Sequence, residues 1–221
     1  MLQAYPTKNG TGVSIFGDYG DLSSLYETVH QIAHTLNEEN KFQKGQHQLL
    51  MNFAYEIRHA YSGDRLTDEF QYPGDDHKLY YSGFQLVWTD ILIFITALRQ
   101  NAGYFSTSKL HQANLYLLEY VIQKALLEYD PAGGEIITIL EKDFSVGNEY
   151  AFIIYQALHI DFVSDRSGKV RFRKIPQLIS HYFNTWSAEY KNLIASFQKS
   201  ATEKGCEITD LEFSEFPEIK W

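Results

Sequence analysis

The residue types with the clearest capacity for chemistry are two Glu-x-x-His pairs, Glu27 with His30 and Glu56 with His59. On a helix this spacing puts the carboxylate and the imidazole on one face, and helical bundles that hold two metal ions use it. His34 extends the first pair to two histidines four residues apart, which also suits a divalent metal. A metal site is therefore one hypothesis for this chain.

The apolar arcs of the same two segments oppose that hypothesis. Metal ligands in a bundle must point inwards, but Glu27, His30 and His34 lie about 90° or more from the centre of the apolar arc. His59 lies on the far side of its own segment. We therefore expect these side chains at the surface, and we expect the chain to have no resident cofactor.

Two carboxylates lie inside the most apolar segments. Asp90 precedes the run Ile-Leu-Ile-Phe, and Glu119 stands between a leucine and a tyrosine. A buried carboxylate destabilises the fold or acquires a raised pKa unless it has a partner. We expect a tyrosine hydroxyl, an arginine or a helix N-terminus as that partner. The alternative is a reactive carboxylate in an enzyme, and the same two residues could complete a two-metal site.

Other motifs of catalysis are weak in this sequence. The turn 17–21 joins an expected strand to an expected helix, where backbone amides could hold phosphate, but Asp18 and Asp21 would repel it. The sequence has no Gly-x-Gly-x-x-Gly, no Walker lysine and no Gly-x-Ser-x-Gly. Cys206 has only Lys204 nearby to lower its pKa. Nucleotide binding and nucleophilic catalysis are therefore not indicated.

Composition predicts a soluble globular protein. The chain has 221 residues with a formal net charge of −9, and 44% of them are hydrophobic. This content excludes disorder, and no break in composition marks a linker, so we expect one domain over residues 1–221. The acidic balance argues against binding to nucleic acid or to an anionic membrane.

The same composition favours a cytoplasmic protein. Cys206 is the lone cysteine and cannot form a disulfide within the chain. The first residues have no basic segment leading into an apolar one, so a secretory signal is not expected. The longest apolar stretch, 86–98, is shorter than the roughly 20 residues that span a bilayer.

The predicted fold is α+β and mainly α, with a small antiparallel sheet. Hydrophobic periodicity predicts helices over residues 21–36, 46–61, 83–101, 106–129, 135–143, 148–160 and 176–201, with Asp21 as the first N-cap. Asn9-Gly10 favours a tight turn in an N-terminal hairpin. The tail 207–221 could add a strand to that hairpin. Residues 62–78 are expected to form a long surface loop, and 162–174 a second hairpin.

The second expected hairpin suggests a DNA-binding wing. Arg171 and Arg173 lie on one face of its return strand. The helix that would enter the major groove, 149–155, has neither arginine nor lysine to meet phosphates or base edges. A DNA-binding regulator is therefore the third choice among the functions considered.

The net charge is concentrated in two segments. Residues 64–77 carry five acids and one arginine, a net −4, and residues 207–218 carry five acids and no base, a net −5. Aromatic residues accompany both segments, and such residues are favoured anchors at interfaces. The residues proposed to contact a partner are Asp68, Glu69, Phe70, Tyr72, Asp75 and Asp76 in the first segment, Glu212, Phe213, Phe216 and Trp221 in the second, and Arg171 and Arg173 in the hairpin.

The opening residues, Ala-Tyr-Pro-Thr-Lys-Asn-Gly-Thr-Gly-Val at 4–13 and Phe-Gly-Asp-Tyr-Gly-Asp-Leu at 16–22, resemble the N-terminus of a bacterial family of uncharacterised cytoplasmic proteins. The likeness covers roughly residues 1–35. It implies a bacterial or phage origin and lends no activity and no site residues.

The leading functional hypothesis is a non-enzymatic protein that binds a macromolecular partner, as an inhibitor, an immunity-type protein or an assembly subunit. It rests on the weakness of the catalytic motifs and on the acidic, aromatic segments. A homo-oligomer is also open. The alternatives are a metal- or ligand-dependent enzyme that uses Asp90 or Glu119, and the DNA-binding regulator.

Overall fold

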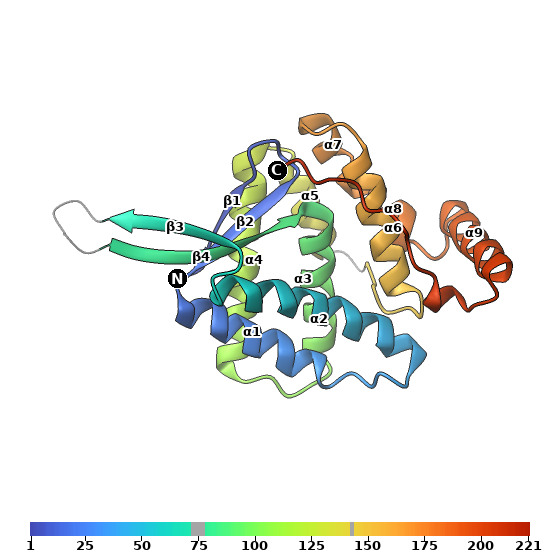
Figure 1. Cartoon of the computed structure of the whole chain (residues 1–221), viewed down its shortest axis with the longest axis horizontal. Helices are drawn as coiled ribbons and strands as arrows, with labels where there is room; N and C mark the ends of the chain where they lie inside the picture. Colours follow the sequence, from blue (N-terminus) through green and yellow to red (C-terminus); the bar gives the residue numbers. More distant parts are fainter. Residues whose placement is uncertain (72–77, 142–143) are drawn as a thin grey trace.

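A four-stranded antiparallel sheet and a larger set of helices form the protein (Figure 1). The computed structural model describes residues 1–71, 78–141 and 144–221. The predicted class, α+β and mainly α with a small antiparallel sheet, is confirmed.

The sheet has the strand order β1-β2-β4-β3, so β1 and β3 are its edges. Its strands are β1 (Gln3–Pro6), β2 (Gly12–Gly17), β3 (Leu66–Gln71) and β4 (Lys78–Val87). The predicted N-terminal hairpin is present as β1 and β2. Gly10 in its turn has a φ of 66°, and a Cβ there would overlap the Tyr129 side chain, so both conformation and space require glycine.

The helices pack against β1, β2 and β4, and the outer part of the β3–β4 hairpin projects away from them. They are α1 (Tyr19–Ala33), α2 (Lys41–Tyr61), α3 (Trp88–Ala102), α4 (Lys109–Tyr129), α5 (Gly133–Glu141), α6 (Ala151–Ser164), α7 (Lys169–Arg173), α8 (Ile175–Phe183), α9 (Ala188–Lys204) and the 3-10 turn η1 (Ile208–Asp210). In Figure 1, α1 and α2 lie side by side along the bottom, α3 and α4 run through the middle, and α6, α8 and α9 form the right-hand side.

The prediction of a long loop over 62–78 is wrong for the residues that the structure describes as strand. Residues 66–71 and 78–87 form β3 and β4, and residues 72–77 lie outside the described part. The helix expected at 83–101 begins only at Trp88, because residues 83–87 belong to β4. Gly83 pairs with Phe16 on β2, and a Cβ on Gly83 would meet that ring at 2.4 Å. The glycine thus lets the aromatic ring cross the neighbouring strand, a cross-strand contact that local periodicity does not report.

The hairpin expected over 162–174 is also wrong, because its two halves are helical. The turn falls where predicted, at 165–168, but α6 runs up to it and α7 follows from Gly168, whose φ is 126°. Phe162 and Phe172 are both buried in the core. Tertiary burial of these rings outweighs the local preference of the segment for strands.

The single helix expected over 176–201 is two helices. Its break is the sequence Asn-Thr-Trp-Ser at 184–187, where the Asn184 side chain accepts the Trp186 N–H and Ser187 caps α9 through Tyr190 N–H. Such side chain to backbone bonds compete with helix continuation. Gly205 ends α9 as predicted, in the left-handed conformation.

The start of α1 also differs from the prediction in detail. Asp18, and not Asp21, is the N-cap, and the two side chains form a reciprocal capping box. Asp21 N–H donates to Asp18 Oδ1 at 2.8 Å, and Asp18 N–H donates to Asp21 Oδ2 at 3.1 Å. The aspartates of this turn are therefore used to begin a helix.

The tail returns to the N-terminal hairpin without pairing as a strand. Residues 207–221, all of which the structure describes, contain η1 and then extended chain with no strand. The Thr11 hydroxyl donates to the Lys220 carbonyl at 2.5 Å, and Asn9 donates to the Trp221 carbonyl at 2.6 Å. Figure 1 shows the tail crossing from α9 over α6 to the β1–β2 turn. The predicted neighbourhood is right and the predicted strand is wrong.

Arg171 joins three parts of the fold beneath this crossing. Its side chain is 3% exposed, and its guanidinium donates to the carbonyls of Phe162 and Asp165 at 3.0 Å each. It also donates to the Thr11 hydroxyl at 2.8 Å. Burial lowers the Arg171 pKa, and nearby Asp165 opposes that shift. The guanidinium therefore closes the C-terminal end of α6 and ties it to the β1–β2 turn.

Among the described helices, none combines the length and the apolar character needed to cross a membrane.

We expect Arg171→Met to lower the free energy of unfolding by about 3 kcal/mol, because it removes charge-assisted bonds and leaves buried carbonyls without donors. Urea denaturation followed by circular dichroism measures this change. Arg166→Ala, at an exposed site in the same turn, should change stability by about 0.5 kcal/mol or less. An unchanged urea midpoint for Arg171→Met would contradict the capping role.

Candidate functional site

Asp90 lies in the first turn of α3 and is 4% exposed. Its Oδ2 is 2.8 Å from His159 Nδ1 and accepts the Tyr155 hydroxyl at 3.5 Å. The Thr89 hydroxyl donates to Oδ1 at 3.3 Å. The tyrosine partner matches one of the predicted alternatives for this carboxylate, whereas the histidine was not foreseen.

Tyr155 and His159 meet Asp90 because they are four residues apart on α6. This spacing puts both side chains on one helix face, and that face packs against α3. Most of the other residues of the helix are apolar, and Ile154 and Leu158 among them are buried. The helix thus delivers two polar groups to one buried carboxylate.

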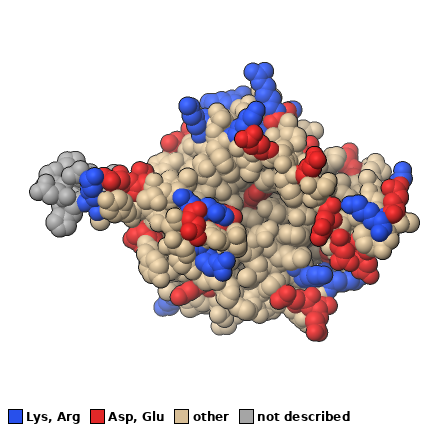
Figure 2. Space-filling model, in the orientation of Figure 1, with Lys and Arg blue, Asp and Glu red and all other residues tan. Residues whose placement is uncertain are grey.

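A cavity of about 420 Å³ opens over this cluster. Its described lining comes from α2, β4, α3, α6 and the tail and consists of Asn52, Tyr55, Glu56, Gln85, Leu86, Val87, Asp90, Phe94, Tyr155, His159, Ile219 and Trp221. Figure 2 shows this face of the molecule hollowed near its centre. The tail forms one wall, so segments that lie far apart between residues 52 and 221 enclose the cavity.

The charge of Asp90 controls the ionisation of its neighbours. Burial lowers the pKa of His159, but the attraction of the Asp90 charge and the hydrogen bond to it outweigh burial, so the net pKa is raised. Burial raises the pKa of Tyr155, and Asp90 raises it further. Tyr155 is therefore a neutral phenol at physiological pH, and His159 binds a proton more readily than an exposed histidine.

Glu56 is the second carboxylate of the cavity, and it already has a counter-charge. Arg65 forms a bidentate pair with it at 2.8 and 3.1 Å. The guanidinium groups of Arg65 and Arg58 also lie over the Tyr55 ring, at 6.0 and 5.4 Å from its centroid. These contacts fix the rim of the cavity beside α2.

Glu119, the other predicted carboxylate, does not line this cavity. It lies on α4, and its Oε1 is 3.2 Å from Arg99 Nε. Burial raises the Glu119 pKa, and Arg99 opposes that shift. The arginine partner is one of the structural partners expected from the sequence.

The structure does not assemble the five candidate metal ligands into one site. The His30 and His34 rings lie 4.2 Å apart, while Glu27 is exposed, Glu56 pairs with Arg65, and His59 bonds Asp64 at 2.9 Å. Burial lowers the His30 pKa, and the neighbouring His34 and His47 lower it further. Across residues 1–71, 78–141 and 144–221, no three His, Cys, Asp or Glu side chains converge as a ligand set.

The candidate partner-binding residues separate into three places. Asp68 and Glu69 are exposed on β3, Phe70 lies in the same strand, and Tyr72, Asp75 and Asp76 fall outside the described residues.

In the tail, Glu212 is exposed and Phe213 packs against Phe197, with ring centroids 6.4 Å apart. Phe216 is half exposed, with its ring 6.0 Å from that of His159, and Trp221 lines the cavity. The tail aromatics thus make contacts within the molecule.

The two arginines of the supposed wing are not a free basic edge. Arg171 is buried, as described above, and Arg173 pairs with Asp130 at 2.9 Å. Lys169 also pairs with Asp130, at 3.4 Å. Arg173, the backbone N–H of Ala132 and Lys169 together lower the pKa of Asp130 to about 2. The groove-reading surface proposed for DNA is therefore not formed.

Sequence reasoning missed His159, Tyr155, Gln85 and the tail wall as parts of one site. The signal available was a tyrosine and a histidine four residues apart in a mostly apolar helix. The cavity itself had no local signal, because its walls meet only through tertiary packing.

The fold and the site define a mainly helical α+β protein with a buried Asp–His pair beneath a cavity. The chain belongs to the family described as a domain of unknown function, DUF6904, whose model matches residues 2–221. The expected relation to a family without known activity is thereby confirmed, over nearly the whole chain and not only its N-terminus. Comparison with curated proteins and with solved structures found no similar protein.

We expect Asp90→Asn to lower the pKa of His159 below the 6.5 of an ordinary imidazole, because burial then acts without the opposing charge. Titration of the His159 ring by NMR measures the shift. Asp161→Asn, on the same helix but bonded to Tyr182, should leave the His159 pKa in place.

The same pair makes stability depend on pH. Since the folded-state pKa of His159 is raised, the contribution of the pair is complete below pH 6.5 and is lost as the pH rises through the folded-state pKa. The difference in unfolding free energy between wild type and Asp90→Asn should shrink accordingly. An Asp90→Asn protein with the wild-type His159 pKa would contradict this coupling.

Proposed function

We propose that the protein binds a small uncharged polar molecule in the Asp90–His159 cavity and that His159 acts there as a general base. This is the ligand-dependent enzyme considered from the sequence, with Asp90 as a positioning residue. The observation that carries it is a buried carboxylate 2.8 Å from the Nδ1 of a histidine that lines a cavity of about 420 Å³.

The Asp90–His159 contact supports proton transfer by fixing the imidazole. When Nδ1 donates its hydrogen to Asp90, Nε2 of the neutral ring is left as the proton acceptor. No described donor or acceptor contacts Nε2 in the structure. After Nε2 accepts a proton, the Asp90 charge stabilises the imidazolium that results.

The proposed reaction is the removal of a proton, either from the bound molecule or from a water molecule that attacks it. The described lining includes no serine, threonine or cysteine, so nothing in it favours a covalent acyl-enzyme. Hydrolysis by an activated water and proton abstraction from the ligand both require one correctly held base.

The charges of the lining favour an uncharged ligand. Glu56 pairs with Arg65, and Asp90 is buried with hydrogen bonds to its oxygens from His159, Tyr155 and Thr89. The other polar side chains of the lining are amides and phenols, with one indole. A charged molecule would find no unpaired counter-charge and would lose hydration on entering.

This proposal replaces the protein-interaction hypothesis as the leading one because of where the tail lies. Trp221 lines the cavity and Phe213 packs on Phe197, so these aromatics already have contacts within the molecule. The polar cluster of Asp90, by contrast, borders the open volume.

The test uses p-nitrophenyl acetate, a small uncharged ester. We expect the wild type to accelerate release of p-nitrophenolate above buffer, with a rate that rises with pH through the His159 pKa, since only the deprotonated ring acts. His159→Gln should lower the excess rate about tenfold or more. His181→Gln, which changes an exposed histidine on α8, should keep the wild-type rate. Equal rates for wild type and His159→Gln would refute the proposal.

A second candidate function is protein binding through the β3–β4 arm. The arm projects beyond the rest of the molecule (Figure 1) and carries acidic and basic side chains (Figure 2). Tyr80 of β4 is 62% exposed and lies opposite the exposed Glu69 of β3. Leu79, 41% exposed, pairs with Phe70, and the exposed Asp68 pairs with Tyr81. Exposed apolar and acidic side chains side by side favour binding to a protein partner. They support the first acidic segment, 64–77, as the contact surface, and not the tail.

Affinity capture from a bacterial lysate tests the arm. A partner retained by the wild type should be lost with the double variant Asp68→Lys/Tyr80→Ser, because the change reverses a charge and removes an aromatic anchor. The matched control is Glu128→Lys/Tyr116→Ser on the exposed face of α4. Identical partners for both double variants would rule out the arm.

The bacterial or phage origin and the cytoplasmic location belong to the same proposal. They rest on the N-terminal resemblance and on the lone Cys206.

A further inference from the structure

A second cavity, separate from the first, lies between α8, the α8–α9 connection and residues 144–148. Its volume is about 730 Å³, and its described lining shares no residue with that of the Asp90–His159 cavity. We propose that this groove binds an uncharged pyranoside, with the Trp186 indole as its stacking platform. The inference does not rest on the function proposed above.

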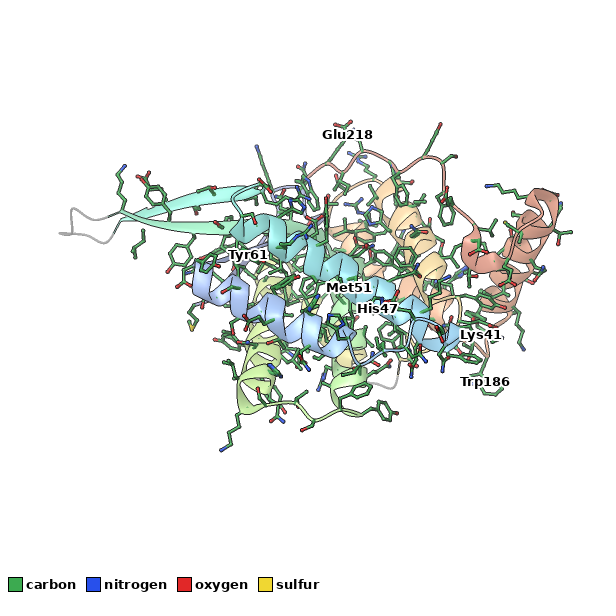
Figure 3. The ribbon with its side chains drawn as sticks, turned by 60° about the horizontal axis from the view of Figure 1, so that its bottom comes forward. Lys41, His47, Met51, Tyr61, Trp186 and Glu218 are labelled. Atoms are coloured by element: carbon green, nitrogen blue, oxygen red, sulfur yellow. The ribbon has the colours of Figure 1, made fainter. Side chains whose placement is uncertain are left out.

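The backbone of Trp186 is held by hydrogen bonds, and its ring is presented to solvent. Its side chain is 86% exposed, and Figure 3 shows it pointing away from the ribbon. The Trp186 N–H donates to Asn184 Oδ1 at 3.2 Å, and the Ser187 N–H donates to the Asn184 carbonyl at 3.0 Å. Because the backbone is already fixed, only the two side-chain torsions of Trp186 remain to be ordered when a ligand binds.

The floor of the groove is apolar. The rings of Phe144 and Phe183 meet edge to face with centroids 5.3 Å apart. Pro176 and the buried Ile179 of α8 complete it. Together with Trp186, this floor suits a ligand with a flat apolar face, such as the C–H face of a pyranose ring.

The polar side chains in the described lining of the groove are all uncharged. The described lining contains the hydroxyls of Ser145, Ser180 and Thr185 and the amides of Asn148 and Asn184, but no Asp, Glu, Lys, Arg or His. An ionic ligand would therefore lose hydration without gaining a counter-charge. Hydroxyls and amides both donate and accept hydrogen bonds, which matches the dual character of sugar hydroxyls.

One donor at the groove has no partner. Asn148 Oδ1 accepts the Tyr150 N–H at 2.8 Å, which fixes the orientation of the amide. Asn148 Nδ2 is buried and has no hydrogen-bond partner among the described residues. A buried donor without an acceptor is unfavourable, and a sugar oxygen would supply the acceptor after a small adjustment of this side chain.

The experiment is an NMR titration of ¹⁵N-labelled protein with cellobiose and with methyl β-D-glucopyranoside at millimolar concentrations. We expect one of them to shift the Trp186 indole N–H saturably, while the indoles of Trp88 and Trp221 stay in place. Trp186→Ala should weaken binding about tenfold or more, as followed by the backbone N–H groups of the groove. Asn148→Ala should weaken it severalfold.

Tyr116→Ala, which removes an aromatic side chain that is 69% exposed on α4, should leave sugar binding unchanged. Trp186 is at the surface, so its variant should keep the wild-type circular dichroism. The proposal is overturned if neither glycoside produces a saturable shift, or if Trp186→Ala binds as the wild type does. A proline-rich peptide that shifts Trp186 when glycosides do not would assign the groove to a protein partner instead.

Discussion

A carboxylate taken out of water must meet a counter-charge, and in this protein Asp90 imposes that constraint on everything around it. The Asp90 carboxylate lies in the first turn of α3, where its negative charge is close to the positive end of the helix dipole. The N-cap residue Val87 supplies no side-chain hydrogen bond to this turn. His159 and Tyr155 must stay within hydrogen-bond reach, which fixes where α6 lies along α3. A slip of one residue between these helices would leave the charge buried and unpaired.

The fold was predictable where one short segment contains all the relevant information. The N-terminal hairpin and α1, α2 and α4 follow from a turn signal and from apolar spacing. Two of the failures lie where remote contacts decide, and a third lies at a local cap. Gly83 permits β4 because Phe16 crosses it from another strand, and the halves of 162–174 become helical because Phe162 and Phe172 enter a core that local sequence does not describe. At 184–187, side chain to backbone bonds divide a continuous apolar stripe.

The site was predictable only in part, for the same reason. An acid among Ile, Leu and Phe announces a buried carboxylate that needs a partner, and its tyrosine partner was among the alternatives. The histidine is 69 residues away in the sequence, and nothing near Asp90 indicates it. Spacing within a helix identified Glu27, His30, Glu56 and His59, but spacing fixes only a shared face. The apolar arcs predicted that Glu27, His30 and His59 do not point inwards, and in the structure Glu27 is exposed while Glu56 and His59 pair with Arg65 and Asp64.

Because the tail returns to the β1–β2 turn, the last wall of the cavity is added late in synthesis. Thr11 holds the carbonyl of Lys220, 209 residues further along the chain, and the wall formed by Ile219 and Trp221 follows every helix in the order of translation. While the ribosome is still adding the tail, α3 and α6 can already pair, but the cavity remains open on that side. Water then reaches His159 more freely, and the burial that opposes its protonation is incomplete.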